Sequence, residues 1–266
     1  MSEGDSYGLP VGSGAGWTDD YEYGRPGWPP DVLSLAGEPR TATVLELGAG
    51  TGKLTRMLVP YFHRVLVLEP QAAMREWLVR LCPRAEVIDG IAEAVSLPDD
   101  SVDAVFVAEA FHKFDASASL REIARVLKPN GSLNLLWNVP AGPVEPPVDD
   151  VEEYLHGVLA DLGLDEERLG HDPTDLNTAR FSSGAWQEPF AGMPFGPLRE
   201  ARVIHRQHTD RDGLVSFYAS MGWIGDMPDA QRLALQKEVR SRLVAPSYSR
   251  PWETRAYWTR LTSGSA

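Results

Sequence analysis

Three glycines at every second position follow a short apolar segment of the chain. Gly48, Gly50 and Gly52 lie in the segment VLELGAGTGKLT, residues 44–55. Glycine tolerates positive φ angles and lets a ligand touch the main chain. A glycine-rich turn between a strand and a helix is therefore typical of a site where a small molecule contacts the backbone. The alternative is a tight strand-to-helix turn without a ligand.

Two acidic residues near this turn narrow the kind of ligand. Glu69 ends the apolar segment 64–69, where a carboxylate can accept hydrogen bonds from both hydroxyls of a ribose. Glu46 lies inside the first apolar segment, and a buried carboxylate is costly unless it is paired or hydrogen-bonded. We expect Glu46 to face a cationic ligand, directly or through water, with a salt bridge to an arginine or lysine as the alternative.

The spacing of the glycines argues against two common nucleotide-binding motifs. A dinucleotide fingerprint needs a third glycine where this chain has Lys53, and the phosphate-binding spacing G-x-x-x-x-G-K-[ST] does not occur. A nucleoside with a ribose and a positive charge but no phosphate fits better. S-Adenosylmethionine carries a sulfonium and an ammonium group and is the candidate cofactor, whereas a nicotinamide cofactor is the less favoured alternative.

Alternating apolar strands and amphipathic helices must position these residues. Apolar residues three and four positions apart predict helices between the strands, as at Met74, Trp77 and Leu78. Strands that alternate with helices predict parallel pairing through right-handed crossovers, and hence an open doubly wound sheet. Prolines prevent a secondary-structure prediction for residues 17–30. The expected strands are residues 43–47, 64–69, 85–89, 101–110, 132–138, 199–209 and 252–261.

The sequence resembles the class I S-adenosylmethionine-dependent methyltransferases over roughly residues 41–139. The segments YEYGRPGWP and AEAFHKFD are similar to the small-molecule branch, methyltransferase type 11, that includes trans-aconitate methyltransferase-like enzymes. The resemblance implies an α/β fold with a Rossmann-like, doubly wound, mostly parallel seven-stranded sheet, an antiparallel C-terminal strand and a helical cap. The segments that carry the broader resemblance are VLELGAGTGKLT, VLVLEP, VIDGIAEAVSLPDDSVDAVFVAEAFHKFD and LREIARVLKPNGSLNLLWN.

The resemblance also implies which residues hold the cofactor. The three glycines would approach its methionine part, Glu69 its ribose, and Ile91 and the backbone of Ala92 its adenine. Relatives often carry Asp or another polar residue at the position of Ile91, so the adenine amino group would rely on backbone groups or on Asp89. The implied cofactor-binding residues are Tyr21, Arg25, Glu46, Gly48, Gly50, Gly52, Glu69, Pro70, Met74, Ile91, Ala92 and Glu109.

Methyl transfer chiefly requires that a nucleophile is held near attack distance and that water is excluded. His112 follows the fourth expected strand and is the candidate catalytic residue, because an imidazole titrates near neutral pH. The alternative is a packing role or a cofactor contact. Lys113 stands where relatives commonly have Trp, so the substrate of a relative cannot be assigned to this chain. We expect no metal site, because His205 and His208 would point to opposite faces of a strand.

The composition restricts the partners of the chain. Its 266 residues carry a formal net charge of −13, and such an acidic surface repels nucleic acid and anionic membranes. A small-molecule acceptor is therefore the expected partner. The chain lacks an apolar segment of membrane-spanning length, its first residues lack signal-peptide features, and Cys82 is the single cysteine. We expect a cytoplasmic protein.

Changes in amino-acid composition along the chain predict how it is divided into parts. Residues 140–195 are rich in proline and acidic residues and could cap a pocket and select the acceptor. The expected parts are a flexible N-terminal arm (1–16), an N-terminal cap (17–40), an S-adenosylmethionine-binding core (41–139), the inserted cap (140–195), and C-terminal strands and helices that complete the same domain (196–266).

Three functions follow from this interpretation. The leading hypothesis is an S-adenosylmethionine-dependent methyltransferase that acts on O, N or C of a small molecule, for example a natural-product intermediate. The second keeps the cofactor pocket but uses the cofactor as a fixed charge for a rearrangement or cyclisation, or only binds it. The third, less favoured, is an NAD-dependent oxidoreductase.

Overall fold

The computed structural model describes residues 16–36, 41–163 and 184–262, and the chain divides into two compact units. β6 (Arg199–Asp210) and β7 (Ser247–Arg260) contribute residues to both units. The core unit comprises Gly27–Ala141, Ser183–His205 and Trp252–Ala266. The accessory unit comprises Met1–Pro26, Gly142–Ser182 and Arg206–Pro251.

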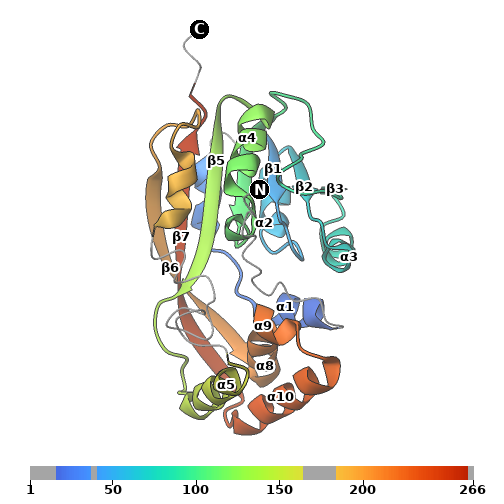
Figure 1. Ribbon diagram of the computed structural model, residues 1–266, viewed down its shortest axis with the longest axis vertical. Helices are drawn as coiled ribbons and strands as arrows, with labels where there is room; N and C mark the ends of the chain where they lie inside the picture. Colours follow the sequence, from blue (N-terminus) through green and yellow to red (C-terminus); the bar gives the residue numbers. More distant parts are fainter. Residues whose placement is uncertain (1–15, 37–40, 164–183, 263–266) are drawn as a thin grey trace. The chain divides into compact units, whose positions relative to one another are not determined.

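A seven-stranded sheet forms the centre of the core unit (Figure 1). Its strand order is β3-β2-β1-β4-β5-β7-β6; β1 pairs in parallel with β2 and β4, β2 with β3, and β4 with β5, whereas β7 is antiparallel to β5. The predicted doubly wound, mostly parallel sheet with an antiparallel C-terminal strand is therefore confirmed. The first five strands are β1 (Thr43–Leu47), β2 (Arg64–Leu68), β3 (Glu86–Ile88), β4 (Val102–Ala108) and β5 (Leu127–Pro140).

Helices cover both faces of the parallel part of this sheet, which explains why β1, β2 and β4 are almost continuously buried. On one face, η1 (Pro30–Ala36), α2 (Thr55–Tyr61) and α3 (Ala72–Leu81) bury side chains such as Phe106 and Leu136 of β4 and β5. On the other face, α4 (Ala116–Val126) packs against η3 (Ala185–Phe190). There the rings of Trp137 and Trp186 lie 5.1 Å apart.

Two boundaries differ from the sequence prediction. β5 begins at Leu127, because Leu127 pairs with Val102 while Ser132 pairs with Ala104. The segment KPNG, which precedes the expected strand 132–138, therefore lies inside the strand as an irregularity, with Asn130 at a φ of 64°. Near the N-terminus, the helix α1 (Trp17–Gly24) forms where prolines had prevented a prediction, because Pro26 and the later prolines all follow it.

The accessory unit is mainly helical. α1 packs closely on α8 (Arg211–Ala219), because Gly24 has no side chain: a Cβ there would lie 2.1 Å from the backbone nitrogen of Phe217. Buried Arg232 pairs with Asp20 of α1 (3.0 Å). The other helices among its described residues are α5 (Asp149–Asp161), α9 (Gly222–Gly225) and α10 (Asp229–Arg242), which contains Arg232.

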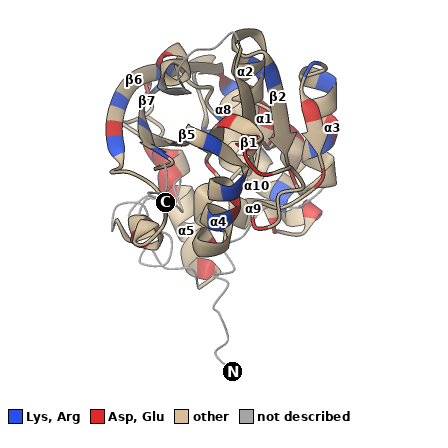
Figure 2. Cartoon of the chain, turned by 90° about the horizontal axis from the view of Figure 1, so that it is seen from above, with Lys and Arg blue, Asp and Glu red and all other residues tan. Residues whose placement is uncertain are grey.

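Charged residues of both signs are interspersed on the described elements. Figure 2 marks the positions of basic and acidic residues, which alternate along β6 and occur together on α3. On β6, Arg202 forms an exposed ion pair with Glu200 (2.6 Å). Among the described residues, none of the helices has the length and hydrophobicity to cross a membrane. The same residues include no group of three or more His, Cys, Asp or Glu side chains arranged to hold a metal ion.

Candidate cofactor site

The glycine turn between β1 and α2 needs glycine for its backbone shape. Gly48, Gly50 and Gly52 have φ angles of 68°, 58° and 89°, which side chains disfavour. A Cβ on Gly48 would lie 2.6 Å from the Cβ of Ala110. A Cβ on Gly52 would lie 2.8 Å from Leu78 of α3. The missing side chains therefore let the turn pack against α3 and against the segment that follows β4.

Glu69 connects the end of β2 to this turn. Its Oε2 accepts a hydrogen bond from the backbone N–H of Gly50 (2.8 Å), and its Oε1 accepts one from the backbone N–H of Gln71 (2.9 Å). A carboxylate oxygen has two lone pairs, so each oxygen can accept one more hydrogen bond. This carboxylate could accept these two further hydrogen bonds from the two neighbouring hydroxyls of a ribose. The described residues therefore fit the nucleoside predicted from the sequence.

Arg75 of α3 holds the end of β2 in place, a role that the sequence analysis missed. Its Nη1 donates to the carbonyls of Glu69 (2.8 Å) and Pro70 (2.6 Å), and its Nη2 donates to Asp89 (2.9 Å). Arg75 thus links the segment after β2 to the segment after β3. An arginine in the first turns of a helix is too common to have indicated this.

The candidate adenosine-binding residues differ in exposure. Ile91, which follows β3, is 49% exposed, and a large apolar side chain at the carboxyl edge of the sheet could cover a ligand ring. Ala92 beside it is buried, and its backbone rather than its side chain is the predicted contact. Met74 is also buried, within α3, whereas Pro70 is exposed. Contacts of these four residues with adenosine stay a prediction.

Glu46 is buried in β1 with its carboxyl group bound by a hydroxyl. Its Oε2 accepts a hydrogen bond from Thr55 Oγ1 (2.6 Å). Burial raises the pKa of Glu46 to about 8, although the hydrogen bond from Thr55 lowers it in part; the nearby charge of Glu69 raises the pKa and that of Arg56 lowers it. Glu46 is therefore mainly protonated at neutral pH in this structure. A cation placed near it would favour the ionised form.

The segment after β4 carries two predicted site residues. Glu109 has a φ of 52°, and its Oε1 accepts a hydrogen bond from the backbone N–H of Asn138 at the end of β5 (2.6 Å). This bond turns the Glu109 carboxylate toward β5. His112 lies in the short helix η2 (Phe111–Lys113) and is half-buried, while Lys113 is exposed. A catalytic role for His112 stays a prediction.

Tyr21 and Arg25, predicted to bind the cofactor, belong to the accessory unit. Arg25 Nε donates to Ser220 Oγ (2.8 Å), and Nη2 donates to the Ser220 carbonyl (3.2 Å). Its guanidinium also lies 5.8 Å from the ring centre of Tyr21 and 5.4 Å from that of Phe217. Arg25 is thus bound within its own unit, and its contact with a cofactor stays a prediction.

A polar cluster that the sequence analysis missed surrounds Asn138. We call Asn138, Glu109, Thr254 and His205, with the carbonyl of Gly27, the Asn138 cluster. The Asn138 side-chain amide donates to Gly27 (3.1 Å), and Asn138 Oδ1 accepts from Thr254 Oγ1 (2.5 Å). His205 Nε2 lies 3.1 Å from the same Oδ1. Burial lowers the pKa of His205 below its ordinary value of 6.5.

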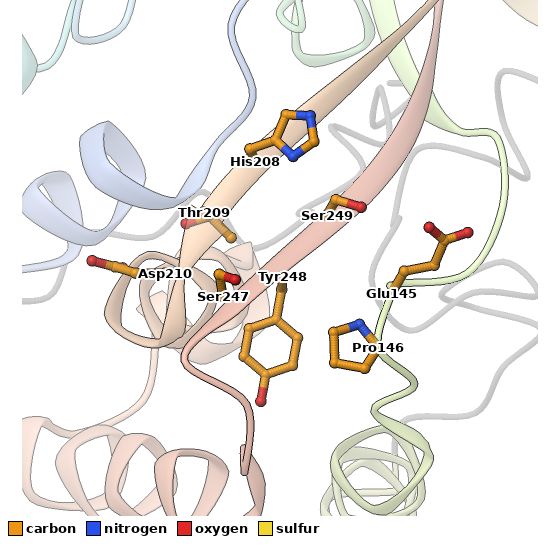
Figure 3. Close-up of a pocket in the computed structure, with 8 residues that line it drawn as sticks. All are labelled: Glu145, Pro146, His208, Thr209, Asp210, Ser247, Tyr248 and Ser249. Carbon is orange, nitrogen blue, oxygen red and sulfur yellow. The ribbon is translucent and has the colours of Figure 1, made fainter.

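The accessory unit contains a pocket of about 730 Å³ (Figure 3). Three of its polar side chains are engaged with the protein itself: Arg206 donates to Glu145 and Ser249, and Asp210 accepts from the N–H of Gly213. We therefore assign no ligand to this pocket. Its lining residues are Glu145, Pro146, His208, Thr209, Asp210, Ser247, Tyr248 and Ser249.

Comparison with known proteins places the chain among methyltransferases. The family described as methyltransferase domain matches residues 45–135. An uncharacterized methyltransferase-like protein of Schizosaccharomyces pombe is 31% identical over 225 residues, which is 83% of this chain and 81% of that protein. An uncharacterized methyltransferase of Mycobacterium tuberculosis is 41% identical over 133 residues, 50% of this chain and 52% of that protein. The chain thus matches about half the length of that relative.

Two solved structures share the fold. The YcgJ protein of Bacillus subtilis has a TM-score of 0.52 at 21% identity, with 87% of this chain and 97% of that chain covered. The [4+2]-cyclase SpnF has a TM-score of 0.51 at 15% identity, with 98% of this chain and 86% of that chain covered.

Proposed function

Because the chain belongs to the family of S-adenosylmethionine-dependent methyltransferases, we propose that it transfers a methyl group from S-adenosylmethionine to a small-molecule acceptor. The observation that carries the proposal is the Glu69 carboxylate, which is anchored to Gly50 of the glycine turn and can still accept two hydrogen bonds. Bound S-adenosylmethionine supplies a methyl group activated by its sulfonium. The protein must then bind the acceptor, orient it toward the methyl group and exclude water.

The carboxyl edge of the sheet would hold the cofactor. The glycine turn would take its methionine part, Glu69 its ribose, and Ile91 and Ala92 its adenine. Glu46 and Glu109 would lie on the methionine side, and Tyr21 and Arg25 would be further cofactor contacts. In support, parallel sheets of this kind bind ligands beyond the carboxyl ends of their strands.

His112 would orient the acceptor or take its proton. It follows β4, and general acid–base catalysis contributes about 100-fold to 10,000-fold. His112→Ala should therefore lower turnover by about 100-fold, since losing either a base or a group that orients the acceptor costs about that much. The affinity for S-adenosylmethionine should stay within about twofold, as measured by titration calorimetry, since a base acts on the acceptor. Exposed His63→Ala is the matched control, and unchanged turnover of His112→Ala would dismiss the role.

The acceptor and its setting are part of the same proposal. We propose a small acceptor methylated at O, N or C, in the cytoplasm, without nucleic acid or membrane as partner. The net charge of −13 and the mixed charges on the described surface support this choice, because polyanions need a basic face.

Two measurements test the proposal. Titration calorimetry with S-adenosylmethionine and S-adenosylhomocysteine should show binding of both. Incubation with acceptor panels should then release S-adenosylhomocysteine. Binding without this product would favour a rearrangement, a cyclisation or binding alone, a possibility raised by the shared fold of the [4+2]-cyclase. Absence of any binding, or binding of NAD instead, would overturn the assignment.

A further inference from the structure

The Asn138 cluster fixes the proton of His205 on one ring nitrogen. The Asn138 side-chain nitrogen must face the Gly27 carbonyl, because only the NH₂ group can donate there. Oδ1 is then the atom near His205, and an oxygen of this kind only accepts hydrogen bonds. Nε2 of His205 therefore carries the hydrogen. Nδ1 of the neutral ring is left with a lone pair, and it has no hydrogen-bond partner among the described residues.

The Asn138 cluster is held by buried residues of several strands and is not a chance contact on the surface. Asn138 is 8% exposed and Thr254 is fully buried. Its members come from the ends of β4 and β5 and from β6 and β7, so four neighbouring strands hold it in place. His205 itself is only half-buried, so its ring can reach a molecule outside the sheet. The partial burial of His205 also favours the neutral ring, because it lowers the pKa of the imidazole.

Direct contacts connect this cluster to the glycine turn. Gly48 lies against Ala110, where an added Cβ would be 2.6 Å from the Ala110 Cβ. Ala110 directly follows Glu109, whose carboxylate binds the backbone of Asn138 (2.6 Å). Asn138 lies two residues beyond Leu136, which pairs with Ala108 at the end of β4. The cluster therefore lies at the same carboxyl edge as the turn, on the β5 side, where an acceptor would face the cofactor.

We infer that His205 contacts the methyl acceptor and takes its proton at Nδ1, and that Asn138 is the positioning residue that sets its tautomer. The inference rests on the proposed function. The acceptor's O–H proton passes to Nδ1, while the oxygen's electron pair forms the bond to the methyl carbon. The electron pair of the broken carbon–sulfur bond stays on sulfur, whose positive charge is thereby lost. His112 is left to orient the acceptor.

A neutral imidazole selects the class of acceptor. Its Nδ1 accepts a hydrogen bond and so prefers an acceptor that still carries an O–H group. A phenol or an enol loses its proton at a pH nearer to that of an imidazole than an alkyl alcohol does, so the transfer is efficient. A carboxylic acid is already ionised at neutral pH and has no proton to give. The structure assigns a phenol or enol as acceptor, and hence O-methylation.

Nitrogen NMR of histidine-labelled protein tests the tautomer without any acceptor. At neutral pH, His205 should show hydrogen on Nε2 and a bare Nδ1. Asn138→Asp places a negative oxygen beside Nε2 and should bring His205 to the doubly protonated form at the same pH. The signals that disappear in His205→Gln are those of His205, and exposed His208→Gln, on the opposite face of β6, should leave them unchanged. A wild-type His205 with hydrogen on Nδ1 would overturn the inference.

Turnover with panels of phenols and 1,3-diketone enols tests the chemistry, with amine and carboxylate panels beside them. His205→Gln should lower S-adenosylhomocysteine formation from the phenol or enol by at least about 100-fold. Its affinity for S-adenosylmethionine should stay within about twofold, and His208→Gln should behave as the wild type. Asn138→Asp should lose turnover near neutral pH.

The outcomes separate the inference from the proposed function. A wild-type protein that does not bind S-adenosylmethionine would refute the proposed function itself. Binding with product formation only from amines or carboxylates, or from none of the panels, would refute the acceptor class and the role of His205 alone. Unchanged turnover in His205→Gln would do the same.

Discussion

The protonation of Glu46 should make the stability of the protein depend on pH. Burial raises its pKa to about 8 from an ordinary value of 4.5, so between these values the folded state binds more protons than the unfolded state. The free energy of unfolding should therefore fall as pH rises through this range. Glu46→Gln keeps an acceptor for Thr55 but does not titrate, so it should be less sensitive to pH.

Urea unfolding at several pH values between about 5 and about 9 measures this effect. Glu76→Gln on the exposed side of α3 is the control and should follow the wild type. If wild type and Glu46→Gln lost stability in parallel over this range, burial of Glu46 would not be the cause.

Glu69 should matter for both the cofactor and the turn. Its carboxylate accepts from two backbone N–H groups, of Gly50 and Gln71, and a glutamine can offer only one oxygen. Glu69→Gln should therefore lose a ribose contact and leave one N–H poorly satisfied. We expect the affinity for S-adenosylmethionine to fall about tenfold to 100-fold in calorimetry, since hydrogen bonds to charged groups contribute about 1.5–3 kcal/mol. An affinity equal to that of Glu76→Gln would exclude Glu69 from the site.

At the scale of the elements, Gly52 should be a structural requirement of the turn. Alanine there would combine a φ of 89° with a Cβ 2.8 Å from Leu78 and 2.9 Å from Cys82. Left-handed backbone and overpacking together predict a loss of about 2–4 kcal/mol in the free energy of unfolding. Gly157→Ala is the matched control, because its Cβ would meet nothing within 4 Å in helix α5. It should stabilise by about 0.5–1 kcal/mol. Equal effects in denaturant unfolding would contradict this packing argument.

Local patterns predicted the elements better than they predicted the contacts between them. The strands and the glycine turn could be located because apolar periodicity and glycine spacing are properties of neighbouring residues. The Asn138 cluster could not, because its hydrogen bonds join residues 29, 67 and 116 positions apart in the chain. No pattern marks an asparagine at the end of a strand as their common partner. His205 was considered only as a metal ligand for the same reason.

The bulge in β5 shows a second limit of local reasoning. Lys128 to Gly131 have the composition of a turn, yet they lie within β5, where the pairing with β4 shifts in register between Leu127 and Ser132. Lys128 also binds Asp103 of β4 (2.8 Å), which holds the irregular segment to its neighbour. Pairing with β4 thus extends the strand through residues whose local preferences would otherwise interrupt it.

At the scale of the whole molecule, charge should decide which partners the protein avoids. A net charge of −13, with basic residues interspersed among acidic ones, leaves polyanions repelled at long range. We expect neither retention on immobilised heparin nor binding to anionic vesicles at about 0.15 M salt, where the screening length is about 8 Å. A small phenol or enol is not subject to this repulsion, and its uptake should be nearly independent of salt. Salt-sensitive binding to RNA or to vesicles would instead point to a basic surface in the complete chain, and the small-molecule assignment would then have to be abandoned.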